Sequence, residues 1–305
     1  KSVIFISHDL DEIMEVCDTL TVLRDGKIIR TFEKAEFEAG AIRASMIGRE
    51  LQGDYYRSDF QASSQPEVAL DVRNLVYEDR LKGISFQVHK GEIVGIGGLA
   101  HCGMHSLGKV CFGALKPEEG SVTVEDGTII DSPAIAMKKR VGYVSKDRDV
   151  ESLCLNASIE DNISIAGMSE FAINNFLILK NREKKYVNHQ IEELSIKCAG
   201  RDQSVSQLSG GNKQKVVFGK WIGCGSEILI LDCPTRGVDI GVKQAMYQLM
   251  VRLKNEGKSI LMISEELPEL IGMSDRILIM KNGEVSAEFE RSETLSDAQI
   301  IEYMI

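Results

Sequence analysis

The start of this chain is repeated near its end, and that repeat limits the possible folds more than any other feature of the sequence. Residues 1–33, KSVIFISHDLDEIMEVCDTLTVLRDGKIIRTFE, align without gaps to residues 258–290, KSILMISEELPELIGMSDRILIMKNGEVSAEFE. The apolar pattern of each copy predicts a buried strand, a helix and a second strand, and the pair Asp25–Gly26 or Asn282–Gly283 predicts a turn after them. The identical pairs include Lys1/Lys258, Ser2/Ser259, Ile6/Ile263, Ser7/Ser264, Leu10/Leu267, Asp18/Asp275, Gly26/Gly283 and Phe32/Phe289.

The repeat predicts the end of one domain followed by a complete second copy of that domain. We expect residues 1–50 to be the C-terminal remnant of the first domain, residues 51–67 a linker, and residues 68–305 the second domain. Polar and small residues interrupt the periodicity in the linker, GDYYRSDFQASSQP. Chance similarity of strand–helix–strand units would explain matching apolar positions, but gap-free identities argue against it. Because the chain starts directly on an apolar run at Val3, we expect it to be a fragment.

The second copy alternates strands with helices. Strands are predicted over VALDVRNLVY, GISFQV and IVGI, and a further apolar strand precedes Asp232. Residues 151–206 are mostly helix-prone, with one helix expected to end at Gly200. This order predicts an α/β fold in which a mixed sheet is joined by crossover helices. The helix-prone stretch reads as an inserted helical subdomain.

A glycine-rich loop, GLAHCGMH, follows the IVGI strand and precedes a helix. Its glycines, Gly98 and Gly103, have the spacing of a P-loop, G-x-x-x-x-G-K-[ST]. Backbone N–H groups at such a helix N-terminus can receive phosphate oxygens. However, Met104 replaces the lysine, and His105 replaces the hydroxyl that holds Mg²⁺. A charge-assisted contact worth about 1.5–3 kcal/mol is therefore missing, and the loop alone also fits an ordinary tight turn.

The strand Ile228–Asp232 is apolar and ends in a carboxylate, which is the Walker B pattern. Asp232 is the residue that would position Mg²⁺ through water. The next residue should be a glutamate that polarises the attacking water, but it is Cys233. A thiol with a pKa of about 8.5 cannot replace a carboxylate at neutral pH. Losing a positioned base typically costs about 10²–10⁴-fold, so we expect very slow hydrolysis at this site.

The string LSGGNKQK opens a predicted helix that runs through Trp221. The hydroxyl of Ser209 and the unobstructed backbone N–H groups of Gly210 and Gly211 would then lie at a helix N-terminus. That arrangement is an anion receptor. A serine cap with flexible glycines would explain these three residues alone, but the Walker B strand that follows favours the receptor.

Together these motifs resemble the ABC ATPase family, and more narrowly the tandem ATP-binding subunits of bacterial ribose-, galactose- and xylose-type sugar importers. The resemblance rests on LSGGNKQKVVFGKWI, LDCPTRGVDIGVK and SEELPELIGMSDRI, and it covers the chain from end to end. It implies an ABC-type P-loop ATPase domain at 68–305, preceded by the C-terminal remnant of a first such domain. In this family each ATP site pairs the Walker motifs of one domain with the signature motif of the other.

The resemblance also implies a role for individual residues. The second copy has lost the P-loop lysine, the Walker B glutamate, the Q-loop amide and the switch histidine, whereas the first copy keeps the histidine. The loss of function is therefore expected on one side only: the second domain keeps the signature that completes the first domain's site. The implied residues are the signature Ser209, Gly210, Gly211 and Gln214, the base-stacking Tyr77, the Q-loop position Lys146, the D-loop Asp239, the switch position Glu265, and the catalytic switch histidine His8 of the first domain.

The implied function is that of an energising subunit at the cytoplasmic face of the membrane, with ATP and Mg²⁺ as cofactors. Its partners would be the missing N-terminal nucleotide-binding half, membrane permease subunits and, indirectly, a periplasmic or extracellular sugar-binding protein. The fragment alone is expected to be inactive. A net charge of −10, without a basic stripe, argues against a nucleic-acid partner. Seven cysteines without a C-x-x-C pair signal neither a zinc site nor a disulfide framework.

Two other functions stay open at this point. One is a soluble tandem ABC ATPase of translation or repair, against which the acidic balance and the string TRGVDIGVK both weigh. The other is a non-catalytic nucleotide sensor, in which the lost residues are themselves the function. The transported solute cannot be read from this chain, because solute choice belongs to the binding protein and the permease.

Overall fold

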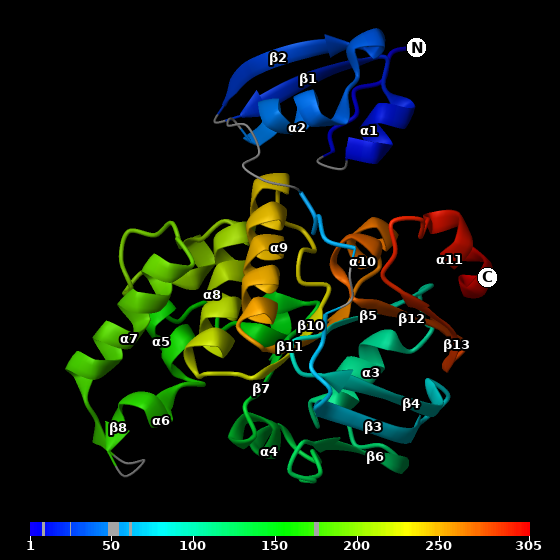
Figure 1. Ribbon diagram of the computed structural model, residues 1–305. Coiled ribbons are helices and arrows are strands. Elements are labelled where there is room, and N and C mark those ends of the chain that lie inside the picture. Colours follow the sequence, from blue (N-terminus) through cyan, green and yellow to red (C-terminus); the bar gives the residue numbers. More distant parts are fainter. Residues whose placement is uncertain (8–9, 25, 48–54, 61–62, 174–176) are drawn as a thin grey trace.

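The computed structural model describes residues 1–7, 10–24, 26–47, 55–60, 63–173 and 177–305. Its larger part is built on a six-stranded sheet, in which every neighbouring pair is parallel except β12 with β13 (Figure 1). The spatial order is β13 (Glu284–Glu290), β12 (Arg276–Lys281), β5 (Ile93–Gly98), β11 (Ser259–Ile263), β10 (Ile228–Asp232) and β7 (Val141–Val144).

A second, antiparallel sheet of three strands lies beside the first (Figure 1). It has the order β4 (Leu81–His89), β3 (Val68–Tyr77) and β6 (Glu119–Val124). The larger sheet is covered on both faces: α3 (Met104–Cys111) packs against β5, β10 and β11, while α9 (Ile240–Asn255) and α10 (Leu267–Met273) pack on the opposite side. The predicted mixed sheet with crossover helices is therefore present.

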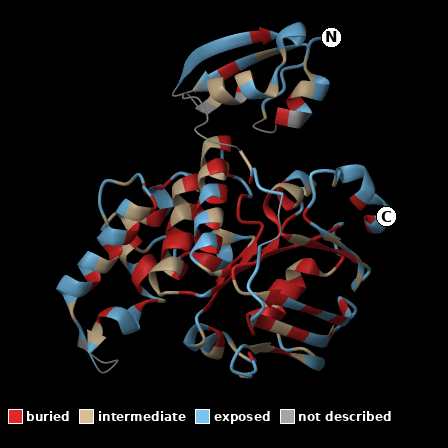
Figure 2. Ribbon diagram, viewed as in Figure 1, coloured by how far each residue is buried: buried red, intermediate tan, exposed pale blue. Residues whose placement is uncertain are grey.

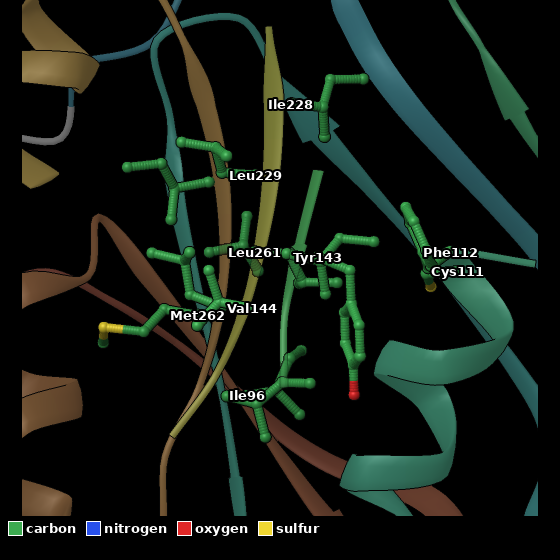
Figure 3. Packing of buried hydrophobic residues seen from close by; sticks show 14 of the residues in the cluster. Ile96, Cys111, Phe112, Tyr143, Val144, Ile228, Leu229, Leu261 and Met262 are labelled. Carbon is green, nitrogen blue, oxygen red and sulfur yellow. The ribbon is translucent and has the colours of Figure 1, made fainter. Parts of the chain in front are cut away.

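The central strands are buried because their sequences are apolar at nearly every position. All five residues of β10 and of β11 are buried, as expected for parallel strands that are covered on both faces (Figure 2). Their side chains interlock with those of β5, β7 and α3, and the ring of Phe112 stacks on that of Tyr143 at 5.4 Å between centroids (Figure 3). This rigid centre holds the strand ends that carry the candidate site.

The predicted helical subdomain contains α5 (Ile159–Ser164), α6 (Met168–Phe171) and α7 (Lys180–Glu193), which are followed by η3 (Val205–Gln207). A short antiparallel pair, β8 (Ala172–Ile173) and β9 (Leu177–Ile178), interrupts the helices. The helix predicted to end at Gly200 ends instead at Glu193. The following residues explain the early end, because Ser195 adopts a left-handed φ of 49° that cannot continue a helix. The remaining short helices are α4 (Pro133–Lys138) and η2 (Arg148–Ser152).

The structural match between the two repeated segments extends beyond the aligned residues. The N-terminal unit consists of α1 (Leu10–Val16), β1 (Thr19–Arg24), β2 (Lys27–Glu33), η1 (Lys34–Glu36) and α2 (Ala39–Ile47). The hairpin β1–β2 matches β12–β13, and both hairpins shift register at equivalent places, Val22/Leu23 and Ile279/Met280. The match continues beyond the aligned residues, because α2 corresponds to α11 (Asp297–Met304).

The first strand of the repeat is missing from the N-terminal unit, and this prediction was wrong. Residues 1–7 form no strand, and the side chains of Val3, Ile4 and Ile6 are 86%, 91% and 92% exposed. Their counterpart β11 is hydrogen-bonded to β5 on one side and to β10 on the other. Nothing equivalent flanks residues 1–7 within the described part of the chain, so the apolar run has no sheet to complete.

Much of the predicted linker is anchored on the larger part of the chain. Residues 55–60 and 63–67 form neither helix nor strand, and 51–54 and 61–62 lie outside the described residues. The ring of Tyr55 lies 5.4 Å from that of Tyr247 on α9, and the buried guanidinium of Arg57 pairs with Asp275 at 3.0 Å. This segment is therefore held in place by an aromatic contact and by a buried ion pair, although its composition is polar.

Candidate functional site

The carboxyl ends of four adjacent parallel strands bring the predicted site residues together. The loop 99–103 follows β5, Glu265 follows β11, Cys233 follows β10, and Lys146 follows β7. Because parallel strands end at the same edge of a sheet, residues far apart in sequence meet there. This edge is the usual place for a ligand in an open α/β sheet.

The glycine loop has the strand–loop–helix geometry predicted from its spacing. Gly103 precedes α3 with a φ of 103°, and a Cβ there would lie 2.1 Å from the carbonyl oxygen of Arg80. A Cβ on Gly98 would lie 2.4 Å from the carbonyl oxygen of Met280. Both positions therefore require glycine. Met104 is only 1% exposed and belongs to the hydrophobic core, so its side chain packs inward.

Three residues that depart from the family pattern contact one another. Lys146 Nζ donates to Glu265 Oε1 at 2.6 Å and lies 3.1 Å from His105 Nε2. The other ring nitrogen of the histidine, Nδ1, lies 2.7 Å from Asp232 Oδ1. The hydrogen bond from Lys146 holds the pKa of the Glu265 carboxyl below its usual value. Lys146 and Glu265 thus neutralise each other's charge, and the His105 ring contacts both of them.

Asp232 is held on both of its oxygens. It is fully buried, and its Oδ2 accepts a hydrogen bond from the Tyr143 hydroxyl at 3.1 Å. Burial, together with the negative charge of Asp232, raises the pKa of Tyr143, so the hydroxyl stays a donor. Sequence reasoning missed Tyr143, whose only signal was its place on the short apolar strand VGYV.

Cys233 has an unusual backbone for a residue with a side chain. Its φ is +49°, in the left-handed region, and its N–H donates to Ile263 O at 2.8 Å. Burial, followed by the charge of Asp232, raises the pKa of its thiol above the usual value. The thiol is therefore protonated at neutral pH in this structure and cannot serve as a general base there.

The predicted signature residues lie at the start of α8 (Gly210–Gly223). Ser209 is the N-cap residue, and its hydroxyl accepts from Asn212 Nδ2 at 2.9 Å. Ser209 is exposed and Gly210 is half-buried, so this helix N-terminus faces solvent. Its partial positive charge and its backbone N–H groups suit an anion.

A cation that sequence reasoning missed lies next to this helix N-terminus. The guanidinium of Arg148 donates to the carbonyl oxygens of Arg236 at 2.7 Å and Gly237 at 3.3 Å, and to Gln214 Oε1 at 3.4 Å. A Cβ added to Gly210 would lie 3.0 Å from Arg148 Nη2. The positive charge thus reinforces the anion-binding character of the helix start.

The other predicted residues lie apart from these two regions or have structural roles. Asp239 caps α9, where its carboxylate accepts from the N–H of Val242 at 3.0 Å. Tyr77 is the last residue of β3 and is half-buried. His8, the predicted switch histidine of the first domain, lies outside the described residues.

Comparison with known proteins agrees with this geometry. A family model described as "ABC transporter" matches residues 81–236. The ribose import ATP-binding protein RbsA of Clostridium tetani is 38% identical over 304 residues, which are 99% of this chain and 59% of that protein. The RbsA protein of Bacillus subtilis is 38% identical over 297 residues, with coverage of 97% and 59%. The chain thus spans about three fifths of the length of these relatives.

Solved structures show the same fold. A nucleotide-free ATP-binding cassette of an ABC transporter has a TM-score of 0.64 at 24% identity, covering 78% of this chain and 99% of that one. The cbiO1 protein of Clostridium perfringens, part of the transporter complex cbiONQ, has a TM-score of 0.63 at 26% identity, covering 77% and 94%. The predicted α/β P-loop ATPase fold is confirmed. Among the described residues, no helix combines the length and the apolar character that crossing a membrane requires.

Proposed function

This chain belongs to the ABC transporter family, and from that premise we propose that it is part of the ATP-binding, energy-coupling subunit of a monosaccharide importer. The names of its relatives, ribose import ATP-binding proteins, support a sugar as the cargo. The subunit would act at the cytoplasmic face of the membrane with permease subunits, and indirectly with a periplasmic or extracellular sugar-binding protein. ATP and Mg²⁺ would be its cofactors.

One observation carries this proposal: the two anion-handling regions of the chain differ in what they can still bind. The start of α8 presents Ser209 and the half-buried Gly210 to solvent, with Arg148 beside them. At the glycine loop, by contrast, Met104 is in the core, and the charges of Lys146 and Glu265 are already paired. The start of α8 can bind a phosphate, whereas the glycine loop has lost the groups that would bind one.

We therefore assign this chain a one-sided role. Ser209, Gly210 and Gly211 complete an ATP site whose phosphate-binding loop belongs to a second nucleotide-binding domain. The N-terminal unit repeats α10, β12, β13 and α11, which supports a tandem arrangement of two such domains. The site at Asp232 and Cys233 does not turn over ATP, because Cys233 replaces the base.

Steady-state phosphate release from the assembled transporter ATPase tests this assignment. Gly210→Asp should lower turnover by more than about tenfold, or about 1.4 kcal/mol in the barrier, because its carboxylate would repel the terminal phosphate in a dry interface. Met104→Leu should change turnover by less than about twofold, since Met104 packs inward and the substitution nearly preserves volume.

Two outcomes would contradict the assignment. Equal effects of Gly210→Asp and Met104→Leu would show that both regions serve catalysis. An unchanged rate with Gly210→Asp, in a variant that assembles normally, would show that the start of α8 meets no phosphate. Co-purification with ribosomes or DNA-repair proteins instead of a permease would favour the soluble alternative.

A further inference from the structure

Three side chains at the end of β10 and the start of α3 bring metal-ligand atoms together. A ring nitrogen of His105, a carboxylate oxygen of Asp232 and Cys233 Sγ all lie within 4.8 Å of one another, and His105 Nδ1 lies 2.7 Å from Asp232 Oδ1. Metal–ligand bonds of about 2.0–2.3 Å place two ligands of a tetrahedral ion roughly 3–4 Å apart. The three atoms are therefore close to the separation that a bound ion requires, and only small side-chain adjustments would close the site.

The groups behind these atoms already hold them in binding orientations. The Tyr143 hydroxyl occupies Oδ2 of Asp232, which leaves Oδ1 facing the histidine ring. On the far side of that ring, His105 Nε2 has a carboxylate oxygen of Glu265 at 3.4 Å. Metal-ligating histidines usually donate their second ring N–H to a carboxylate, and ligating carboxylates are themselves hydrogen-bonded. Both supporting contacts are present here.

The histidine ring can be held in either tautomer. When Nδ1 carries the proton it donates to Asp232, and Nε2 can accept from Lys146 Nζ, 3.1 Å away. When Nε2 carries the proton it can donate to Glu265, and the lone pair of Nδ1 is then on the side of Asp232, whose Oδ1 is 2.7 Å away. Because the ammonium of Lys146 lies 3.1 Å from Nε2, ion binding at Nδ1 requires Lys146 to donate to Glu265 instead, which it already contacts at 2.6 Å.

We propose that His105, Asp232 and Cys233 form a binding site for a transition-metal ion, with Zn²⁺ the best match. A sulfur, a nitrogen and an oxygen ligand suit Zn²⁺ and Co²⁺. Mg²⁺ prefers oxygen ligands in octahedral geometry and would not select this set. Three protein ligands leave one tetrahedral position for water. This inference does not rest on the proposed transport function.

Charge and protons balance when the ion binds. The Cys233 thiol loses its proton to solvent and becomes a thiolate, while the proton on His105 Nδ1 is replaced by one on Nε2. The two charges of the cation are then matched by Asp232 and Cys233, and the Lys146–Glu265 pair stays neutral as a whole. Metal affinity should therefore fall with acidification, because the ligands must be deprotonated.

Cysteine spacing in the sequence gave no sign of this site. Zinc motifs are recognised by closely spaced pairs such as C-x-x-C, whereas here His105 lies 127 residues before Asp232, and Cys233 is the next residue along the chain. Only the fold brings α3 to the end of β10. The left-handed φ of Cys233 is unusual for a residue with a side chain, and such a conformation persists only where the surrounding structure imposes it.

Titration of the metal-free chain with Co²⁺ tests the proposal. We expect saturation at about one equivalent, a sulfur-to-cobalt charge-transfer band in the near ultraviolet, and the intense visible bands of four-coordinate Co²⁺. Zn²⁺ should displace the cobalt, and a large excess of Mg²⁺ should not. Cys233→Ser should abolish the charge-transfer band, and Tyr143→Phe should weaken binding by about 10–100-fold.

Matched variants separate this site from casual binding at other thiols. Cys154→Ser, at the exposed cysteine, should leave the cobalt spectrum unchanged. His105→Asn replaces a partly exposed side chain and should fold, which circular dichroism would verify, yet lose the visible bands. An unaltered spectrum in Cys233→Ser, or a loss of the spectrum in Cys154→Ser, would overturn the proposal. So would binding of Co²⁺ without any sulfur band in the unmodified chain.

Discussion

Among single residues, Glu269 on α10 is a carboxyl group whose ionised form is disfavoured by burial. It is buried and accepts hydrogen bonds from the hydroxyls of Thr235, at 2.6 Å, and Ser264. Burial raises the pKa of Glu269 even though both hydrogen bonds oppose that shift. Two neutral donors therefore do not replace the water that the ionised carboxylate has lost.

Glu269→Gln should change how stability depends on pH. An acid whose pKa is raised on folding contributes most stability below its unfolded pKa, and that contribution is lost as pH rises through the folded value. The free energy of unfolding of the unmodified chain should thus carry a falling component above about pH 4.5, the ordinary pKa of a glutamate. Glutamine does not titrate, so the variant should gain relative stability as the pH rises.

Urea unfolding at about pH 4 and about pH 8 measures this difference. Glu266→Gln is a suitable control, because Glu266 is exposed and its carboxylate pairs with Lys243 at the surface, at 2.7 Å. A gain in Glu269→Gln that is the same at both pH values would contradict the expectation.

Residues of the candidate site were predictable where spacing alone identifies them. Gly98, Gly103 and Asp232 follow from motif spacing, and the structure places the loop and the carboxylate at one edge of the sheet. Tyr143 and Arg148 could not be predicted, because nothing in their neighbours along the chain indicates which side chain they will meet. Their contacts, with Asp232 and Gln214, exist only once β7 lies beside β10.

At the scale of elements, the docking of residues 55–60 and 63–67 depends on one carboxylate. Asp275 is buried and binds Arg57 Nη2 at 3.0 Å and Lys254 Nζ at 2.8 Å. It also accepts from the N–H of Ile93, the first residue of β5, at 2.8 Å. The same side chain thus ties the segment, α9 and the central sheet together, and its loss would leave two buried cations short of a partner.

Asp275→Asn should lower the free energy of unfolding by about 3 kcal/mol, because removing one partner from a buried ion pair leaves uncompensated charge. Chemical denaturation measures the loss. Asp59→Asn is the matched control: Asp59 pairs with the same Arg57, but its side chain is 51% exposed. An exposed pair contributes at most about 1 kcal/mol, so equal losses in the two variants would contradict the central role of Asp275.

Strands were predictable where an apolar run in the sequence also has neighbouring strands to pair with in the fold. The apolar runs of β10 and β11 predicted buried parallel strands, and those strands formed. The equally apolar run Val3–Ile6 did not form a strand, because a strand needs neighbours that a local sequence cannot supply. The anchoring of residues 55–60 and 63–67 was missed for a similar reason, since Arg57 and Asp275 lie far apart in the sequence.

For the whole molecule, the one-sided site predicts that the chain by itself does not hydrolyse ATP. Met104 and Cys233 stand where a lysine and a general base would be needed, and no second phosphate-binding loop faces the start of α8 within the described residues. Phosphate release from the purified chain with Mg-ATP should stay at background. Turnover of about one per second, typical of slow enzymes, would show that a complete site exists.

The N-terminal unit should open before the rest of the molecule. Its small core, formed by Leu10, Val22, Phe32 and Ile42, is completed by Ile240 of α9. The larger part of the chain has a far larger core around β10 and β11 (Figure 2). Native-state hydrogen exchange should therefore give β1 and β2 a lower opening free energy than β10 and β11. The amides of residues 3–6, whose side chains are mostly exposed, should exchange fastest.

Ile240→Ala tests how far the N-terminal unit depends on its contact with α9. Truncating this buried side chain should cost about 2–5 kcal/mol where its contacts are lost, and those contacts belong to the small core. Protection of β1 and β2 should fall, while β10 and β11 stay protected. Ile4→Ala, at a 91% exposed position, should change neither. Strong, concentration-independent protection of residues 4–6 in a monomer would mean that the apolar run docks onto its own chain, and the predicted boundary at residue 50 would have to move.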